Sequence, residues 1–284
     1  MSKQCRIGVV APASRMSPEV VGKVKALAER RFRGRGPDIV FHPQCFASHG
    51  HFAGDDDTRA QAFLEVANDE RFDAVWVARG GYGSCRMVEG VMGRLTDVAR
   101  RKTYMGYSDA GMLLAALYRA GFTGAAHGPV AQDVMREGGD AAVTRALDWI
   151  VDRAPAALEP SVANGKKTAA FNITILSQLL GTPLQPDLDG HVLMLEEVGE
   201  AMYRIDRSLF HITSNPAIRR VAGIMLGRCS SITPNDPDFG MNEEEVARFW
   251  CARSGIAWLG RADIGHDPDN KVVPFGSLRA GARA

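Results

Sequence analysis

The sequence is poor in the features that mark membrane proteins and nucleic-acid-binding proteins. It has no run of about eighteen apolar residues, which is the length that a membrane-spanning helix needs. Aromatic residues make up only 7% of the 284 positions and do not alternate with basic ones, so a base-stacking surface is not expected. The formal net charge of +1 gives no reason to expect nucleic acid or a membrane surface as a partner.

Cysteine is also scarce. The five cysteines are scattered, odd in number and never arranged as CxxC, so neither a disulfide framework nor a zinc site is expected. The amino-terminal segment MSKQCRIGVVAPAS leads almost at once into an apolar strand, without the longer apolar stretch of a signal peptide. We therefore expect a cytoplasmic protein.

Apolar runs and helical periodicity alternate along the first half of the chain. Repetition of strand and helix predicts a parallel sheet with helices on both faces, as in flavodoxin-like folds. Ser17 and Pro18 have the pattern of an N-cap and a first helical residue. The expected strands are residues 7–10, 38–41, 72–78, 103–107 and 124–129, and the expected helices are 20–31, 58–68, 111–120 and 140–152.

A segment rich in alanine and proline separates this half from a second, smaller α/β domain. We place the first domain at 1–153, the connecting segment at 154–168 and the second domain at 169–284. In the second domain the expected strands are 192–195, 222–226 and 257–259, and the expected helices are 172–180, 202–213 and 242–254.

The stretch KTYMGYSDAG, residues 102–111, places Ser108 and Asp109 where a buried strand turns into a buried helix. A side chain at such a turn is held at the carboxyl end of the sheet, where open α/β folds bind ligands. The following helix directs its N–H groups to the same place, which suits a developing oxyanion. The alternative is that the serine or the aspartate only caps the helix.

A glycine-rich stretch follows the preceding strand and reads Arg79-Gly80-Gly81-Tyr82-Gly83-Ser84-Cys85-Arg86. Glycines let the backbone approach a ligand closely and leave N–H donors free. The stretch lacks the spacing and the GK[ST] ending of nucleotide-binding loops. It could form an oxyanion hole or bind a substrate carboxylate beside Ser108, or it could be only a tight turn.

Acidic residues and a histidine follow two later strands. Glu196, Glu197 and Glu200 come at the end of an apolar strand, where a carboxylate is costly unless it is exposed or paired. One of them could orient a histidine, or all three could form a solvated charge run. His266, next to a glycine, either acts as a base or has a structural role. Serine, carboxylate and histidine thus occur in an order that can build a nucleophilic triad.

These segments together resemble the serine L,D-carboxypeptidases of peptidoglycan recycling and the related microcin-immunity peptidases. The resemblance covers nearly the whole chain and keeps eight segments in order. The stretch SITPND at 231–236 is similar to a loop of the murein-tetrapeptide branch. The chain departs from the family pattern at Ala169 and Ala170, which replace glycines, and at Glu197, where aspartate is more usual.

The resemblance implies a nucleophile, a base and an orienting carboxylate, namely Ser108, His266 and Glu196. It implies release of the terminal D-alanine of a murein tetrapeptide by a homodimer, with no metal or other cofactor. The oxyanion hole would use the N–H groups of Gly81 and Asp109. The substrate-binding residues would come from the glycine-rich stretch, at Arg79, Gly80, Tyr82 and Arg86.

Two other functions are compatible with the same residues. An immunity-type serine peptidase would cleave a peptidyl or aminoacyl nucleotide antibiotic. A flavodoxin-like binding protein without catalytic activity would hold a phosphate ligand at the glycine-rich stretch.

Overall fold

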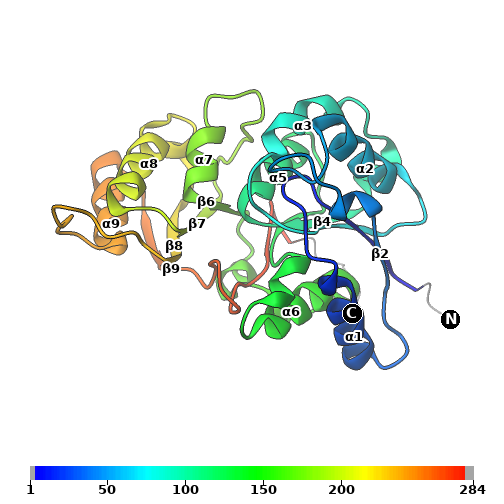
Figure 1. Ribbon diagram of the computed structural model, residues 1–284. Coiled ribbons are helices and arrows are strands. Elements are labelled where there is room, and N and C mark those ends of the chain that lie inside the picture. The colour runs from blue at the N-terminus through cyan, green and yellow to red at the C-terminus, as the bar shows by residue number, and fades with distance from the viewer. Residues whose placement is uncertain (1–3, 279–284) are drawn as a thin grey trace.

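Two β-sheets lie side by side in the computed structural model, which describes residues 4–278 (Figure 1). The larger sheet has the order β10-β5-β4-β3-β1-β2; β10 runs antiparallel to β5, and the other neighbours pair in parallel. The smaller sheet is parallel and has the order β6-β7-β8-β9. The expected α/β class with a second, smaller α/β unit is confirmed. The strands are β1 Arg6–Val10, β2 Asp38–Phe41, β3 Ala74–Val77, β4 Thr103–Gly106, β5 Ala125–His127, β6 Thr168–Asn172, β7 Val192–Val198, β8 Gly223–Ser230, β9 Trp258–Arg261 and β10 Val273–Pro274.

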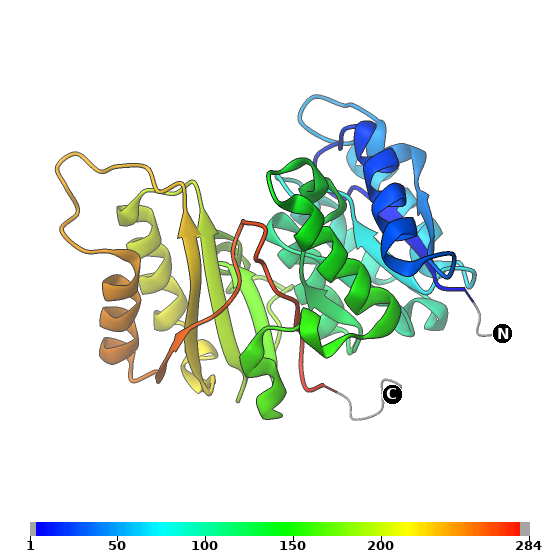
Figure 2. The same ribbon diagram turned by 90° about the horizontal axis from the view of Figure 1, so that it is seen from below.

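Helices cover both faces of the larger sheet and one face of the smaller sheet (Figures 1 and 2). On the larger sheet, α1 and α6 pack against one face, and α2, α3 and α5 pack against the other. None of the helices within residues 4–278 is long and apolar enough to cross a bilayer. The α-helices are α1 Glu19–Phe32, α2 Asp56–Asn68, α3 Ser84–Met92, α4 Asp97–Arg100, α5 Gly111–Arg119, α6 Gly139–Asp152, α7 Ile173–Leu179, α8 Met202–Ser214 and α9 Glu243–Ser254, and the 3-10 helices are η1 Pro43–Phe46, η2 Ser108–Ala110, η3 Ala131–Met135, η4 Pro155–Ala157, η5 Pro160–Asn164 and η6 Ile218–Arg220.

The central strands β3 and β4 are buried along their whole length. Because helices cover both faces of the sheet, neither strand alternates between apolar and polar residues, and both read as continuous apolar runs. Their carboxyl ends lead directly into the glycine-rich stretch and into the turn that contains Ser108. The packing of the sheet thus brings these two segments to the same edge.

The structure differs from the sequence-based expectations in three local details. Ser17 does not cap α1, because the helix begins after Pro18 and has no side-chain cap. The glycine-rich stretch is followed by α3, a helix that the sequence analysis missed. Strand β7 continues to Val198, so Glu196 and Glu197 lie within a strand and are buried rather than forming a solvated charge run.

The chain returns to the larger sheet at its carboxyl end. After β9 it passes between the two halves of the molecule, and β10 then pairs with β5 (Figure 2). Residues 273–274 therefore belong to the larger sheet, although they fall within the expected second domain. The boundaries placed at 153 and 169 stay a prediction.

His127, the last residue of β5, is buried in the centre of the molecule. Its Nε2 lies 3.3 Å from Oδ1 of Asn270, on the segment that connects β9 to β10. Burial lowers the pKa of His127 to about 4, because the imidazolium would lose its hydration. The folded chain therefore holds His127 in its neutral form.

This burial predicts a loss of stability as the pH falls. Between the unfolded-state pKa of 6.5 and the folded-state value of about 4, the unfolded chain binds the extra proton and is favoured. The free energy of unfolding should decrease by about 3 kcal/mol across this window in urea titrations. His127→Gln should remove most of that dependence, whereas His211→Gln, at an exposed position, should keep it. An equal slope in the His127→Gln and wild-type proteins would contradict this account.

Candidate active site

Ser108 lies in a strained turn at the carboxyl end of β4. Its φ angle is +60°, a left-handed conformation that is unfavourable for serine and that occurs often at functional sites. Gly80 packs against the turn, and a Cβ atom there would lie 3.1 Å from Cβ and 3.2 Å from Oγ of Ser108. A glycine at position 80 thus leaves room for the serine side chain.

Asp109 connects the Ser108 turn to the glycine-rich stretch. Its carboxylate is buried and accepts hydrogen bonds from the N–H of Ser84 at 2.9 Å, the N–H of Gly83 at 3.2 Å and the hydroxyl of Ser84. Burial raises the pKa of Asp109, and the hydrogen bonds from Ser84 oppose that rise. The alternative that Ser108 or Asp109 caps α5 is wrong, because Asp109 instead binds the first turn of α3.

Two backbone donors near Ser108 are available to a ligand. Within residues 4–278, the N–H groups of Gly81 and Asp109 donate no hydrogen bond. Gly81 lines the same cavity as Ser108, and Asp109 follows Ser108 directly in the chain. The two N–H groups therefore have the capacity to bind an oxyanion.

Glu196 and His266 form a buried pair. Glu196 is fully buried in β7, and its Oε2 lies 2.5 Å from Nδ1 of His266. The ring of Tyr107 packs against the imidazole at a centroid distance of 4.7 Å. In the described part of the chain Nε2 of His266 has no hydrogen-bond partner, so it is free to exchange a proton with a group in the cavity.

Glu197 has a different environment from Glu196. Its carboxylate accepts hydrogen bonds from Nδ2 of Asn172, from the N–H and hydroxyl of Thr174, and from the N–H of Val198, at 2.5–2.9 Å. Burial raises the pKa of Glu197, and these hydrogen bonds oppose that rise. Glu197 thus holds the start of α7 against β7, whereas Glu196 contacts the histidine.

His266 lies in a loop rather than at the end of β9, where the sequence analysis expected it. Arginines from both halves hold this loop. Arg136 donates to the carbonyl of His266 at 2.5 Å, and Arg145 donates to the carbonyls of Pro268 and Asn270 at 2.9 and 2.8 Å. Arg228 of β8 binds the loop by ion pairs with Asp263 and Asp267.

A cavity of about 570 Å³ contains both Ser108 and His266. Gly80, Gly81 and Arg79 line it from the larger sheet, and residues of β6, β7 and α7 line it from the smaller one. Within residues 4–278 the hydroxyl of Ser108 makes no hydrogen bond, so serine and imidazole share the cavity without a direct bond. The cavity is large enough for a small peptide or a ligand of similar size.

Two of the expected substrate-binding residues lie outside this cavity. Tyr82 is half exposed and packs beside Phe52, and Arg86 pairs with Asp56 of α2 at 2.7 Å. Arg136 and Asp133, which were not predicted from the sequence, belong to a chain of contacts behind the histidine. Asp133 accepts from the hydroxyl of Tyr107 at 3.1 Å and pairs with Arg136 at 3.3 Å. No local pattern marked these residues, because the contacts that connect them to the site, from Tyr107 to Asp133 and from Arg136 to His266, join distant segments.

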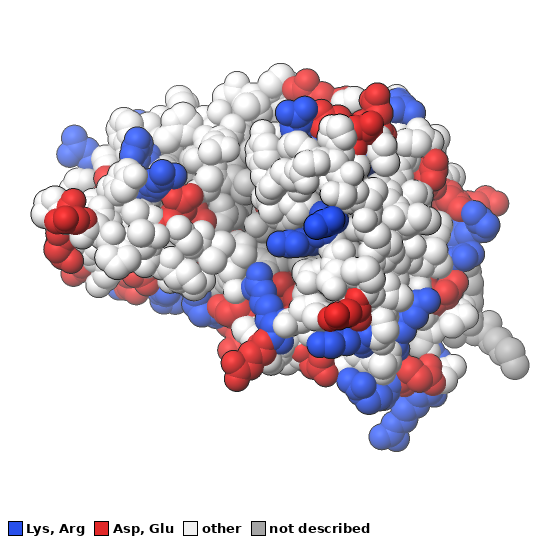
Figure 3. All heavy atoms as spheres, viewed as in Figure 1, with Lys and Arg blue, Asp and Glu red and all other residues white. Residues whose placement is uncertain are grey.

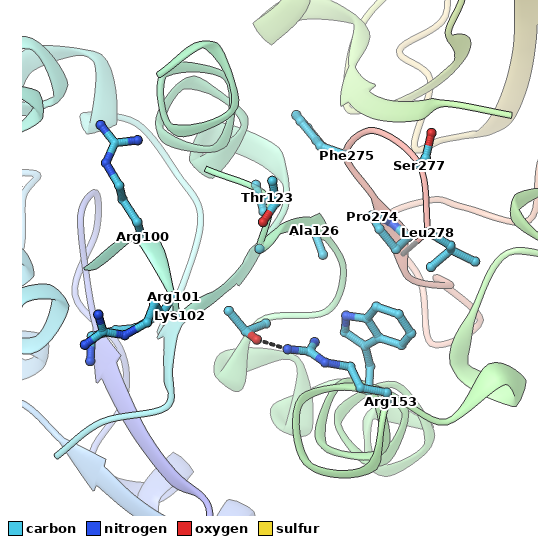
Figure 4. Close-up of a pocket in the computed structure, with 14 residues that line it drawn as sticks. Arg100, Arg101, Lys102, Thr123, Ala126, Arg153, Pro274, Phe275, Ser277 and Leu278 are labelled. Atoms are coloured by element: carbon cyan, nitrogen blue, oxygen red, sulfur yellow. Dashed lines mark hydrogen bonds between the residues drawn. The ribbon is translucent and has the colours of Figure 1, made fainter. Parts of the chain in front are cut away.

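A different cavity, of about 410 Å³, lies at the opposite ends of β4 and β5 (Figure 4). It is lined by Arg153, which bonds to Thr103 at the start of β4, and by Phe275. Ser108, Glu196 and His266 do not contribute to it. The carboxyl ends of the strands therefore hold the candidate active site.

Comparisons with known proteins identify the family of this chain. The family model of the LD-carboxypeptidase N-terminal domain matches residues 7–128, and that of the LD-carboxypeptidase C-terminal domain matches residues 167–279. The murein tetrapeptide carboxypeptidase of Pseudomonas aeruginosa is 26% identical over 292 residues, which cover 95% of this chain and 91% of the relative.

Solved structures with the same fold include both branches of the expected family. The muramoyltetrapeptide carboxypeptidase from Oxalobacter formigenes has a TM-score of 0.78 at 22% identity and covers 96% of both chains. The microcin C7 self immunity protein MccF, in complex with aspartyl sulfamoyl adenosine, has a TM-score of 0.78 at 16% identity and covers 97% of this chain and 92% of its own. The two domain matches confirm the resemblance seen in the sequence. The chain therefore belongs to the LD-carboxypeptidase family and is a serine-type carboxypeptidase.

Proposed function

We propose that this enzyme releases the terminal D-alanine from murein tetrapeptides and that Ser108, His266 and Glu196 carry the reaction. The main support is the 2.5 Å contact between Glu196 and Nδ1 of His266, because it leaves Nε2 for the cavity that contains Ser108. Family resemblance supports a role in cytoplasmic peptidoglycan recycling and a homodimer. The two domain matches favour an enzyme over a binding protein without catalytic activity.

The reaction follows from the groups in the cavity. The Ser108 hydroxyl attacks the carbonyl carbon between diaminopimelate and D-alanine while Nε2 of His266 takes its proton. Collapse of the tetrahedral intermediate breaks the peptide bond, and His266 returns the proton to the amine of D-alanine. Water then attacks the acyl-enzyme with the same base and releases the tripeptide. Glu196 stabilises the imidazolium and holds its tautomer.

The N–H groups of Gly81 and Asp109 are the proposed oxyanion donors. Both are free within the described residues, and the Asp109 carboxylate holds the Gly83–Ser84 segment against the serine turn. Such a donor typically contributes a factor of about 10²–10³ to the rate.

Arg79 is the proposed partner of the terminal carboxylate. Arg79 and Arg136 are the arginines of the cavity, and Arg136 already pairs with Asp133 and donates to the carbonyl of His266. Arg79 is exposed and donates only to the carbonyl of Arg15, at 3.2 Å, among the contacts of residues 4–278. Its guanidinium is therefore available, whereas that of Arg86 is paired with Asp56.

An immunity-type activity is the second candidate, because a microcin C7 immunity protein has the same TM-score as a muramoyltetrapeptide carboxypeptidase. The 26% identity to a murein tetrapeptide carboxypeptidase over most of the chain favours the murein substrate. Parallel assays with tetrapeptide and with aspartyl sulfamoyl adenosine discriminate between the two. Cleavage of the nucleotide alone would reverse the assignment.

The role of Ser108 as the nucleophile can be tested by removing its hydroxyl. Ser108→Ala should reduce tripeptide formation, measured by mass spectrometry, by a factor of about 10³ or more, because no other group can form the acyl-enzyme. Circular dichroism should show an unchanged fold. A variant that keeps more than about a tenth of the activity would refute the role of Ser108.

Substitutions of the two neighbouring acids should have different effects. Glu196→Gln should lower kcat by a factor of about 10³–10⁴, because the amide can no longer stabilise the imidazolium. Glu197→Gln should keep most of the activity and instead lower the melting temperature, since Glu197 binds α7. The opposite ranking of the two kcat values would assign the role to Glu197.

Substitutions of Arg79 and Arg86 should also have different effects. Arg79→Met should lower kcat/KM for the tetrapeptide by a factor of about 10–100, the usual worth of a charge-assisted hydrogen bond. Arg86→Met should have little effect on kcat/KM. With a substrate that ends in D-alaninamide, the wild type and Arg79→Met should be equally slow. If Arg79→Met reduces cleavage of the two substrates by the same factor, Arg79 does not bind the terminal carboxylate.

A further inference from the structure

Another cavity, of about 430 Å³ and called the second cavity below, adjoins the one that contains Ser108. Thr174 and Glu200 line both, so the two cavities are direct neighbours. The second cavity lies between α7 and the first turns of α8, and its lining is entirely polar or aromatic. The remaining lining residues are Ser177, Gln178, Tyr203, Arg204, Arg207 and Ser208.

The charges in the second cavity do not cancel. Arg204 pairs with Glu200 at 3.5 Å, and its Nε donates to the hydroxyl of Tyr203 at 3.1 Å. Arg207 stacks over the ring of Tyr203 at 5.2 Å and has no carboxylate partner among the described residues. This leaves one exposed guanidinium without a counter-charge, in cation–π contact with an aromatic ring. Figure 3 shows basic side chains over α8, beside the hollow between the two halves.

The position of this cavity relative to Ser108 indicates which part of a substrate it could hold. A carboxypeptidase binds the leaving residue on one side of the nucleophile and the rest of the peptide on the other. Arg79, the proposed partner of the terminal carboxylate, comes from the larger sheet. The neighbouring cavity lies on the other side, toward α7 and α8 of the smaller sheet, where the remaining residues of the peptide could extend.

We propose that the cavity between α7 and α8 binds the amino-terminal arm of the peptide and that Arg207 pairs with a carboxylate of that arm. This inference rests on the proposed function. In a murein peptide the γ-linked D-glutamate keeps its α-carboxylate, and diaminopimelate has a second carboxylate in its side chain. Arginine binds carboxylates with two parallel hydrogen bonds, so an acidic arm matches the unpaired guanidinium.

The test measures binding in the Ser108→Ala background, where no peptide is consumed. Isothermal titration should show that Arg207→Met weakens tetrapeptide binding by a factor of about 10–100, while Arg207→Lys recovers part of the loss. Arg248→Met is the matched control, because Arg248 is an exposed arginine that pairs with Glu244 on α9. It should leave the affinity unchanged.

Two modified peptides identify the carboxylate. One has isoglutamine in place of γ-D-glutamate, and the other has lysine in place of diaminopimelate. The peptide that lacks the carboxylate bound by Arg207 should have the same affinity for the protein with Arg207 and for the protein with Arg207→Met. If Arg207→Met weakens binding of all three peptides by the same factor, or of none of them, the inference is overturned.

The outcomes separate this inference from the proposed function. If the wild type converts tetrapeptide to tripeptide but Arg207 does not affect binding, only the subsite is lost. If the wild type neither cleaves nor binds the tetrapeptide, both proposals fail.

Discussion

The contact between Glu196 and His266 is the interaction on which the geometry of the site depends. A carboxylate as deeply buried as Glu196 would cost several kcal/mol without a partner, and the imidazole is that partner. Strand β8 leaves room for the contact at Gly227, where a Cβ atom would lie 3.0 Å from Cβ of Glu196 and 2.6 Å from the carbonyl oxygen of Ile264. A larger residue at position 227 would collide with Glu196 and with the segment that leads to His266, so β8 requires a glycine there.

The site depends equally on the junction of the two sheets. Ser108 ends a strand of the larger sheet, whereas Glu196 belongs to the smaller sheet and His266 to the loop after it. Arg136 and Arg145, both from the first half, donate to carbonyl groups of that loop. The same loop binds Glu196 and Arg228 of the second half, so a shift between the halves would disturb its contacts, and the interface between the sheets is part of the active-site geometry.

The three buried acids of the site have different hydrogen-bond partners and different roles. Asp109 and Glu197 each accept several backbone and side-chain hydrogen bonds and hold α3 and α7 in place, while Glu196 bonds to the histidine and has one oxygen without a partner in the described residues. Each of the two structural acids stands directly beside a residue proposed to take part in the chemistry. The polypeptide thereby couples the shape of the glycine-rich stretch and of α7 to the positions of Ser108 and Glu196.

The sequence by itself determined the α/β class, the boundaries of β2 and the position of Ser108 at a strand-to-helix turn, because these follow from local periodicity and turn chemistry. It did not predict α3, β6 or β10. The family resemblance singled out Glu196, and the tertiary structure showed that it contacts a histidine 70 positions away. Tertiary structure alone also decided that Arg86 pairs with Asp56, that β10 joins the larger sheet, and that Arg207 of α8 lines a cavity together with α7. Each of these contacts joins segments that are distant in the chain, and a local pattern has no information about them.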